Sequence, residues 1–155
     1  MHNIRLVATD LDGTFLRDNK SISTPNMEAL KLLGEKGIIR VAATGRNLRK
    51  TEEVVARHVP FDYIVYASGA GVFDWNVRNH LYTLNIPEET ANELIQFFIF
   101  EDLNFHVFKP APHNHLLWYH RGSRYCGEFE RYFDFHDEYA APLPPDGKTH
   151  SDVCQ

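Results

Sequence analysis

Short apolar runs alternate with stretches of helical periodicity in the first part of the chain. Residues 4–8, 38–43 and 63–67 have the length and continuous apolar character of strands buried in a parallel sheet. Between the first two runs, apolar residues recur at helical spacing, and Thr24 and Gly37 are a typical helix start and stop. Strand, helix and strand in this order predict a right-handed βαβ unit. The expected fold class is therefore α/β.

The pattern changes near residue 85. Before that point, a second helix is expected from about Asn47 to His58, and alternating segments on either side of residues 76–79 predict a hairpin. The later expected elements are a helix, two strands and another helix, at residues 87–101, 104–108, 115–120 and 124–133. The proline-rich residues 140–155 are expected to be a loop or a disordered tail. Two parts result, residues 1–84 and residues 85–155.

Charge is distributed unevenly between the two parts. The chain of 155 residues has a formal net charge of -5, but residues 1–82 carry +2 and residues 83–155 carry -7. An acidic second part without a basic run argues against nucleic acid as a partner. The apolar runs are too short to cross a membrane, and the first strand begins without a signal-peptide pattern, so we expect a cytoplasmic protein. Cys126 and Cys154 are expected to be free thiols.

Two carboxylates one residue apart, Asp10 and Asp12, directly follow the first apolar run. Open α/β sheets place their chemistry at the carboxyl ends of strands, and Gly13 permits the chain to curl there. Asp10 is ionised at neutral pH and suits nucleophilic attack on phosphorus, while Asp12 suits proton transfer to the leaving oxygen and from water. Two carboxylates beside a phosphate need a cation, and oxygen ligands favour Mg²⁺. The alternative is a plain Asp-Gly turn after a strand.

The second apolar run ends in Thr44-Gly45-Arg46, and this loop should lie beside the Asp pair because neighbouring parallel strands end at one edge. The Thr44 hydroxyl, the Gly45 N–H and the start of the following helix are suited to bind the same phosphate. Backbone N–H groups from Leu11 to Gly13 can also hold phosphate oxygens. Arg46 would add positive charge there or, alternatively, form a surface salt bridge.

The seven residues from Asp10 to Leu16, DLDGTFL, resemble the first sequence motif of the haloacid dehalogenase (HAD) superfamily. Residues 41–46, VAATGR, look like the second motif as it occurs in the Cof-like branch, which carries a type IIB cap. The Ser-Gly-Ala turn at residues 68–70 with its hairpin, and the α-β-β pattern after residue 87, fit this branch too. The resemblance implies a Rossmann-like parallel-sheet core in the first part and a partial α+β cap in the second.

Carried over position by position, the resemblance implies individual roles. Asp10 is the implied nucleophile and a Mg²⁺ ligand, and Asp12 is the implied acid/base with its backbone carbonyl on the metal. Thr44 and Gly45 are implied phosphate ligands. The branch more often has Asn where this chain has Ser68. Members of the branch also supply a lysine and a Gly-Asp pair after the cap, and neither motif is present here, so the resemblance implies a chain that ends inside the cap.

In the family's sheet, strands from the missing part flank the first strand. Without them, residues 4–9 would form an exposed apolar edge strand, which is unfavourable for a soluble monomer. Three outcomes are open: the chain is a fragment of a longer protein, it self-associates or is complemented by a partner through the sheet edge, or it is poorly stable.

Histidines and aromatic residues of the second part offer other candidate sites. His106, His113, His115 and His120 lie near Cys126 in the sequence, but they lack the spacing of a zinc site and suit solvated or structural roles better. The aromatic side chains are expected to form mostly cap core, with one or two lining a substrate cleft.

Two functions follow, and both are retained. The first is a Mg²⁺-dependent phosphatase that hydrolyses a small phosphorylated metabolite through an aspartyl-phosphate, with a sugar phosphate as the substrate that the resemblance implies. The second is a catalytically incomplete chain that acts at most as a binding or interaction module, because the family's lysine and C-terminal acidic motif are absent. A mutase or phosphotransferase would use the same nucleophile and differ in the acceptor.

Overall fold

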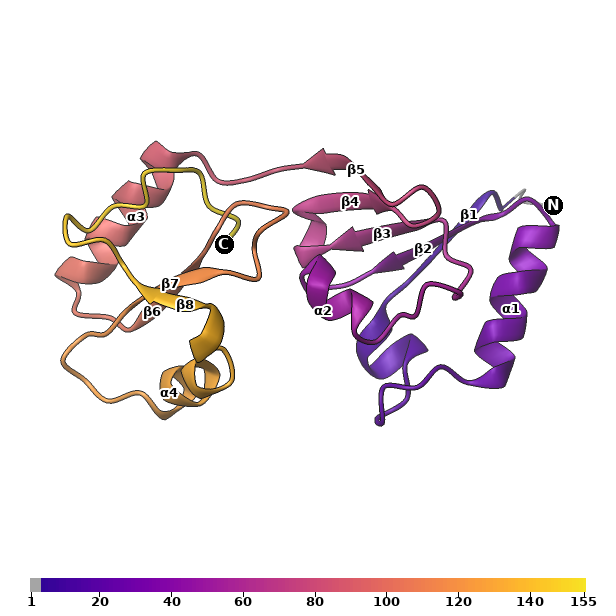
Figure 1. Cartoon of the computed structure of the whole chain (residues 1–155), viewed down its shortest axis with the longest axis horizontal. Helices are drawn as coiled ribbons and strands as arrows, with labels where there is room; N and C mark the ends of the chain where they lie inside the picture. The colour runs from indigo at the N-terminus through magenta and orange to yellow at the C-terminus, as the bar shows by residue number, and fades with distance from the viewer. Residues whose placement is uncertain (1–3) are drawn as a thin grey trace. The chain divides into compact units, whose positions relative to one another are not determined.

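Two compact units, Met1–Thr83 and Leu84–Gln155, make up the chain in the computed structural model, which describes residues 4–155. The first unit is built on a five-stranded sheet with the strand order β1-β2-β3-β4-β5 (Figure 1). Its strands are β1 (Leu6–Thr9), β2 (Ile39–Ala43), β3 (Tyr63–Tyr66), β4 (Gly71–Asp74) and β5 (Asn79–Thr83). The first three are parallel, and the β4–β5 hairpin adds two antiparallel strands. The predicted α/β fold with a parallel sheet is confirmed.

The helix between β1 and β2 is α1 (Thr24–Glu35). The Ser23 hydroxyl accepts a hydrogen bond from the Asn26 N–H at 3.2 Å, so Ser23 and not Thr24 is the N-cap. Gly37 follows the helix with φ of +68°, a conformation that glycine adopts without a steric penalty. The βαβ unit therefore forms as predicted, and it brings the loops after β1 and β2 to the same edge of the sheet.

The second helix, α2 (Leu48–Glu52), is shorter than the predicted span of residues 47–58. Beyond it the chain turns, and Val55 and Val59 are buried at 1% and 2% exposure. Burying a valine side chain is worth about 1.5 kcal/mol or more, and β-branched residues gain little from remaining helical. The longer helix was a wrong prediction, because the apolar spacing after α2 reflects the burial of turn residues.

Strand β1 forms one edge of the sheet. In the part of the chain that the structure describes, only β2 pairs with it. Apolar side chains at this strand are exposed to solvent: Leu6 is 50% exposed, and Ile4, just before the strand, is 61% exposed. The expectation of an exposed apolar edge strand is confirmed, and its consequence for association is taken up below.

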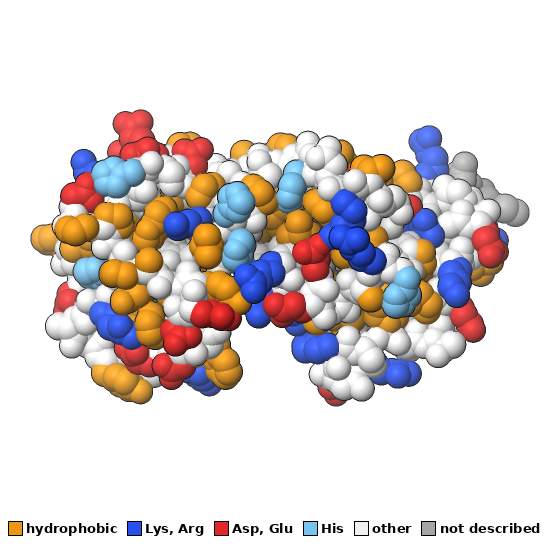
Figure 2. Space-filling model, in the orientation of Figure 1, with side chains coloured by type: hydrophobic (Ala, Val, Ile, Leu, Met, Phe, Trp, Pro, Cys, Tyr) orange, Lys and Arg blue, Asp and Glu red, His pale blue; other side chains and the backbone are white. Residues whose placement is uncertain are grey.

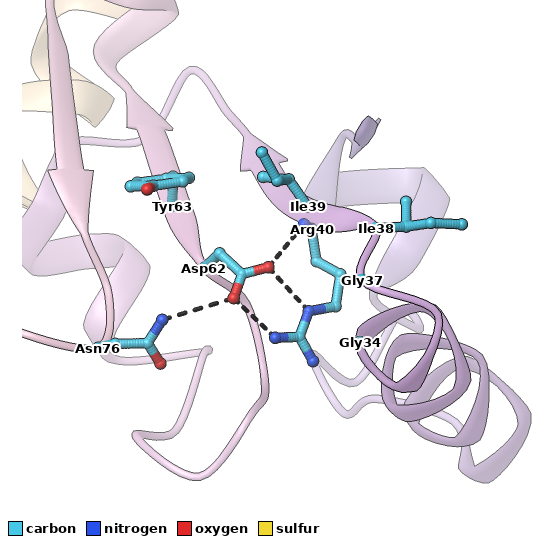
Figure 3. Close-up of a pocket in the computed structure, with 8 residues that line it drawn as sticks. All are labelled: Gly34, Gly37, Ile38, Ile39, Arg40, Asp62, Tyr63 and Asn76. Atoms are coloured by element: carbon cyan, nitrogen blue, oxygen red, sulfur yellow. Dashed lines mark hydrogen bonds and ion pairs between the residues drawn. The ribbon is translucent and has the colours of Figure 1, made fainter. Parts of the chain in front are cut away.

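At the amino-terminal ends of the neighbouring strands β2 and β3, Arg40 and Asp62 form a partly buried ion pair (Figure 3). The Arg40 side chain donates from Nε and Nη2 to the two carboxylate oxygens at 2.9 and 2.7 Å, and the Arg40 backbone N–H donates to Asp62 at 2.8 Å. Asn76 adds a longer bond of 3.5 Å. A side chain on Gly34 would overlap the guanidinium. This pair ties two strands together at the end of the sheet away from the Asp pair.

The second unit holds a three-stranded sheet, ordered β6-β7-β8, and two helices. Its elements are α3 (Glu88–Phe100), β6 (Phe105–Phe108), β7 (Leu117–His120), α4 (Gly127–Asp134) and β8 (Ala140–Pro142). Ala91 and Ile95 of α3 pack with Val107 and Val153 to form its core. On the face that Figure 2 shows, acidic, basic and hydrophobic side chains of this unit are interspersed. The predicted α-β-β-α order is present.

The segment after residue 140 is packed onto this unit. β8, which the sequence pattern did not predict, pairs in parallel with β7. Val153 and Ile86 exchange backbone hydrogen bonds of 2.7 and 3.0 Å, and the Cys154 N–H donates to Phe108 at 2.9 Å. Val153 and Cys154 are buried. Residues 140–155 were expected to be either a loop or a disordered tail. The structure shows a loop after β8, which these backbone hydrogen bonds and buried side chains hold in place.

His106 is packed among aromatic rings. Its ring stacks on Phe129, with centroids 4.4 Å apart, and lies 4.9 Å from the Tyr132 centroid. Burial lowers the pKa of the His106 imidazole, which favours the neutral ring. Of the solvated and structural roles expected for the histidines, packing among aromatic rings supports a structural role for His106.

Candidate active site

Asp10 stands at the carboxyl end of β1, at the entrance to a wide π-type turn over Leu11–Phe15. Gly13 has φ of +73° within the turn, and the Leu16 N–H closes it by donating to the Leu11 carbonyl at 2.8 Å. The Leu11 side chain is fully buried and anchors the turn in the core. The curl that Gly13 was expected to permit is therefore formed, and it leaves the Asp10 and Asp12 side chains exposed.

Asp10 lines an open pocket of about 340 Å³ together with residues from the loops after β2 and β3. The other lining residues are Ala43, Thr44, Gly45, Val65, Ser68 and Gly69. The structure thus brings together three of the predicted site residues, Asp10, Thr44 and Gly45. Among residues 4–155, none forms a hydrogen bond or ion pair with the Asp10 carboxylate, so it faces this pocket unpaired.

Thr44 is held at the pocket wall by its backbone and its hydroxyl. Its N–H donates to the Val65 carbonyl at 2.9 Å, and its carbonyl accepts from the Ser68 N–H at 3.1 Å. The Thr44 hydroxyl oxygen accepts the Arg46 N–H at 3.2 Å, which leaves its own O–H able to donate to a bound anion. The following helix, α2, has five residues, so its dipole adds less than the sequence suggested.

Asp12 is clamped by two cations from different loops. Arg46 donates from Nε to Oδ2 at 2.6 Å and from Nη2 to Oδ1 at 2.8 Å, and Lys20 Nζ donates to Oδ1 at 2.7 Å. These hydrogen bonds, from Arg46 first and Lys20 second, hold the pKa of the Asp12 carboxyl well below its usual range. Of the two roles expected for Arg46, a salt bridge is the one formed, and its partner is a residue of the predicted site.

Two residues that sequence reasoning left out of the site lie within it. Ser68 lines the pocket and Lys20 pairs with Asp12. Ser68 has φ of +53° and follows Ala67 with φ of +48°, so this turn holds two non-glycine residues in the left-handed region. The polar, turn-forming residues after the Asp pair were a signal for Lys20, because the bridge between Leu16 and Ile22 returns the chain toward Asp12.

Mg²⁺ fits the donors that the site offers. The Asp10 carboxylate and the Asp12 backbone carbonyl offer oxygen donors, and Mg²⁺ commonly takes one or two carboxylates and completes its shell with water and phosphate. The Asp12 side chain is engaged by Lys20 and Arg46, so the expected contact of Asp12 with the ion would be made by its backbone carbonyl. Over residues 4–155, no cluster of three or more Asp, Glu, His or Cys side chains is placed to hold a metal ion.

Comparison with known proteins identifies the family. The sequence model of the haloacid dehalogenase-like hydrolases matches residues 7–148. The chain belongs to this family. This match confirms the resemblance inferred from the DLDGTFL and VAATGR motifs, and it spans both units of the haloacid dehalogenase-like chain.

Two curated relatives are phosphatases by name. The chain is 34% identical over 74 residues to the 5-amino-6-(5-phospho-D-ribitylamino)uracil phosphatase YcsE of Bacillus subtilis, which covers 48% of this chain and 30% of that protein. It is 28% identical over 105 residues to the HMP-PP phosphatase of Serratia proteamaculans, which covers 68% of this chain and 38% of the relative. The chain therefore spans less than half the length of these relatives.

Solved structures of the family share the fold. The phosphatase BT1666 from Bacteroides thetaiotaomicron superposes with a TM-score of 0.70 at 21% identity, over 93% of this chain and 50% of that one. The HAD subclass IIB sugar phosphatase BT4131 gives a TM-score of 0.64 at 18% identity, over 96% of this chain and 56% of the other. Both units of this haloacid dehalogenase-like chain thus have counterparts in structures about twice as long.

Proposed function

We propose that the chain carries the nucleophile of a Mg²⁺-dependent phosphatase that hydrolyses a small phosphorylated metabolite, a sugar phosphate in our proposal. The observation that supports this most is the unpaired Asp10 carboxylate facing a pocket shared with Thr44 and Gly45. A carboxylate nucleophile beside a hydroxyl and a backbone N–H suits attack on a phosphate whose oxygens those donors bind. The names of the relatives, which are phosphatases of phosphorylated small molecules, agree with this substrate class.

The reaction proceeds in two steps in this proposal. The Asp10 carboxylate attacks phosphorus, the bond to the leaving oxygen breaks, and that oxygen takes a proton; water then attacks the aspartyl-phosphate and releases phosphate. Thr44 and Gly45, with the N–H groups after Asp10, hold the phosphate oxygens. When bound by Asp10 and the Asp12 carbonyl, Mg²⁺ offsets the charge between carboxylate and phosphate.

Asp12 serves as the proton-transfer group. Its ion pairs with Arg46 and Lys20 oppose protonation, so the arrangement seen here suits the step in which Asp12 accepts a proton from water. Donation to the leaving oxygen requires that one of the two cations part from Asp12 first.

We propose further that residues 1–84 belong to the core domain and that residues 85–155 are part of a cap that selects the substrate. In the described residues, no helix is both long enough and apolar enough to cross a membrane. A cytoplasmic location is our proposal, and the free thiols of Cys126 and Cys154 suit its reducing conditions.

The test of this function is hydrolysis of a generic aryl phosphate by the purified chain. We expect turnover in Mg²⁺ and its loss, by about a hundredfold or more, when EDTA removes the ion, because the ion offsets charge in both steps. Restoring Mg²⁺ should restore the rate. Hydrolysis that continues unchanged in EDTA would contradict the proposed use of the ion.

A second candidate function rests on the open edge of β1. Ile4 and Leu6 are exposed beside β1, and among the described residues only β2 pairs with this strand, which suits a module that associates with a copy of itself or with a complementing partner. This function would require no catalysis.

Association through β1 makes a separate prediction. We expect the wild-type chain to sediment as a dimer or larger species at micromolar concentration, and Leu6→Lys to shift it toward the monomer, because a charge on an edge strand opposes pairing. Val77→Lys, at an exposed site in the β4–β5 turn, is the matched control and should leave the distribution unchanged. A wild type that remains monomeric in analytical ultracentrifugation would rule out self-association.

A further inference from the structure

Lys20 reaches Asp12 from a turn that the chain builds with several hydrogen bonds. Leu16 and Ile22 pair across the base of the turn as an antiparallel bridge. Within it, the Arg17 N–H donates to the Ser21 carbonyl at 2.9 Å, and the Lys20 N–H donates to the Arg17 carbonyl at 2.8 Å. The turn therefore presents Lys20 in a defined position.

The backbone at Lys20 is in a conformation that lysine seldom adopts. Its φ is +64°, in the left-handed region where glycine carries no penalty and asparagine is better tolerated than lysine. A lysine in this conformation lowers the free energy of unfolding relative to a glycine at the same position. Strained backbone of this kind is more frequent at functional sites, and the contact that the Lys20 side chain makes is with Asp12.

The contact completes a clamp on one carboxylate. Arg46 alone holds Asp12 through both oxygens, at 2.6 and 2.8 Å, and Lys20 adds a second donor to Oδ1 at 2.7 Å. Because the two cations come from separate loops, the carboxylate cannot rotate without breaking a bond to at least one of them. The two carboxylates of the site, Asp10 and Asp12, are also balanced by two positive charges.

We propose that Lys20 is a positioning residue of the phosphate site, which together with Arg46 holds the Asp12 carboxylate in the orientation that accepts a proton from the attacking water. The inference rests on the proposed function, since it assigns a role within that reaction. Lys20 acts through Asp12, and its removal should therefore change kcat more than KM.

Three variants of the full chain test this role in the aryl phosphatase assay with Mg²⁺. Lys20→Gly should lower kcat by about ten- to a hundredfold with little change in KM, because Asp12 loses a fixed orientation. Its thermal midpoint should equal or exceed that of the wild type, since glycine relieves the backbone strain. Lys20→Arg should retain most of the activity, because arginine also donates to a carboxylate. Lys31→Gln, on the exposed side of α1, controls for the change in net charge.

The outcomes separate the inference from the function on which it rests. If the wild type hydrolyses the ester and Lys20→Gly does so equally well, the positioning role is overturned and the phosphatase stands. If Lys20→Gly melts earlier and Lys20→Arg does not rescue it, Lys20 is a structural residue and the inference also fails. A wild type without Mg²⁺-dependent hydrolysis overturns the proposed function and the inference together.

Discussion

Replacing Asp10 with asparagine should lower kcat for phosphate-ester hydrolysis by about a thousandfold or more, because an amide cannot form the aspartyl-phosphate. The side chains are nearly isosteric, and Asp10 is exposed at the pocket without a partner in the part of the chain that the structure describes. The fold should therefore be unaffected. The measurement is steady-state hydrolysis in Mg²⁺, together with the circular dichroism spectrum and the thermal midpoint of each protein.

The matched control for this change is Asp18→Asn in the turn between Leu16 and Ile22, which removes the same charge from an exposed position nearby. We expect it to keep wild-type kcat and KM. Loss of activity in both variants would show that the change in net charge, and not the loss of the nucleophile, lowers the activity. Activity that survives Asp10→Asn would exclude Asp10 as the nucleophile.

Asp62→Asn should lower the free energy of unfolding of the first unit by about 2–3 kcal/mol, because the Arg40 guanidinium would lose its carboxylate in a partly buried site. Arg40 makes three hydrogen bonds to Asp62, and the two side chains are 16% and 22% exposed. Their burial distinguishes this pair from the more exposed Lys50–Glu53 pair, which should contribute little. Urea unfolding of the two proteins at pH 7 is the measurement, and Asp18→Asn should unfold with the wild type.

The contribution of Asp62 should depend on pH. The hydrogen bond from Arg40 lowers the pKa of the Asp62 carboxyl in the folded state below its value in the unfolded chain. The stabilisation is therefore present in full above about pH 4, the ordinary range of an aspartate, and is lost as the pH falls through the folded-state pKa. The difference in unfolding free energy between wild type and Asp62→Asn should shrink in acid. A difference that stays constant from pH 7 to strongly acidic solution would show that the charge of Asp62 is not its source.

The sequence carries most of the information about the site because parallel strands end at one sheet edge. The loop after β1 and the loop after β2 could be placed side by side from the strand–helix–strand order alone, and the structure does bring Asp10, Thr44 and Gly45 to one pocket. Helix α1 and the β4–β5 hairpin could also be predicted, because helical periodicity and turn residues are local signals.

Features that depend on contacts between residues far apart in the sequence could not be predicted from it. Nothing local to Lys20 shows that its side chain reaches Asp12, and the Arg40–Asp62 pair joins residues 22 positions apart. The shortened α2 and the ordered tail have the same origin, because tertiary burial of Val55, Val59 and Val153 decided where those segments lie. Periodicity reports which residues are apolar, whereas burial depends on the neighbours that the fold supplies.

The most direct measurement is to trap the covalent intermediate. The wild-type chain is mixed with an aryl phosphate and Mg²⁺, quenched in acid within the first turnover, digested and examined by mass spectrometry. We predict one added phosphoryl group on the peptide that contains Asp10, localised to that side chain and absent from Asp10→Asn. Hydrolysis that proceeds with no phosphoryl group on Asp10, or with the group on another residue, would contradict the assignment of Asp10 as the nucleophile.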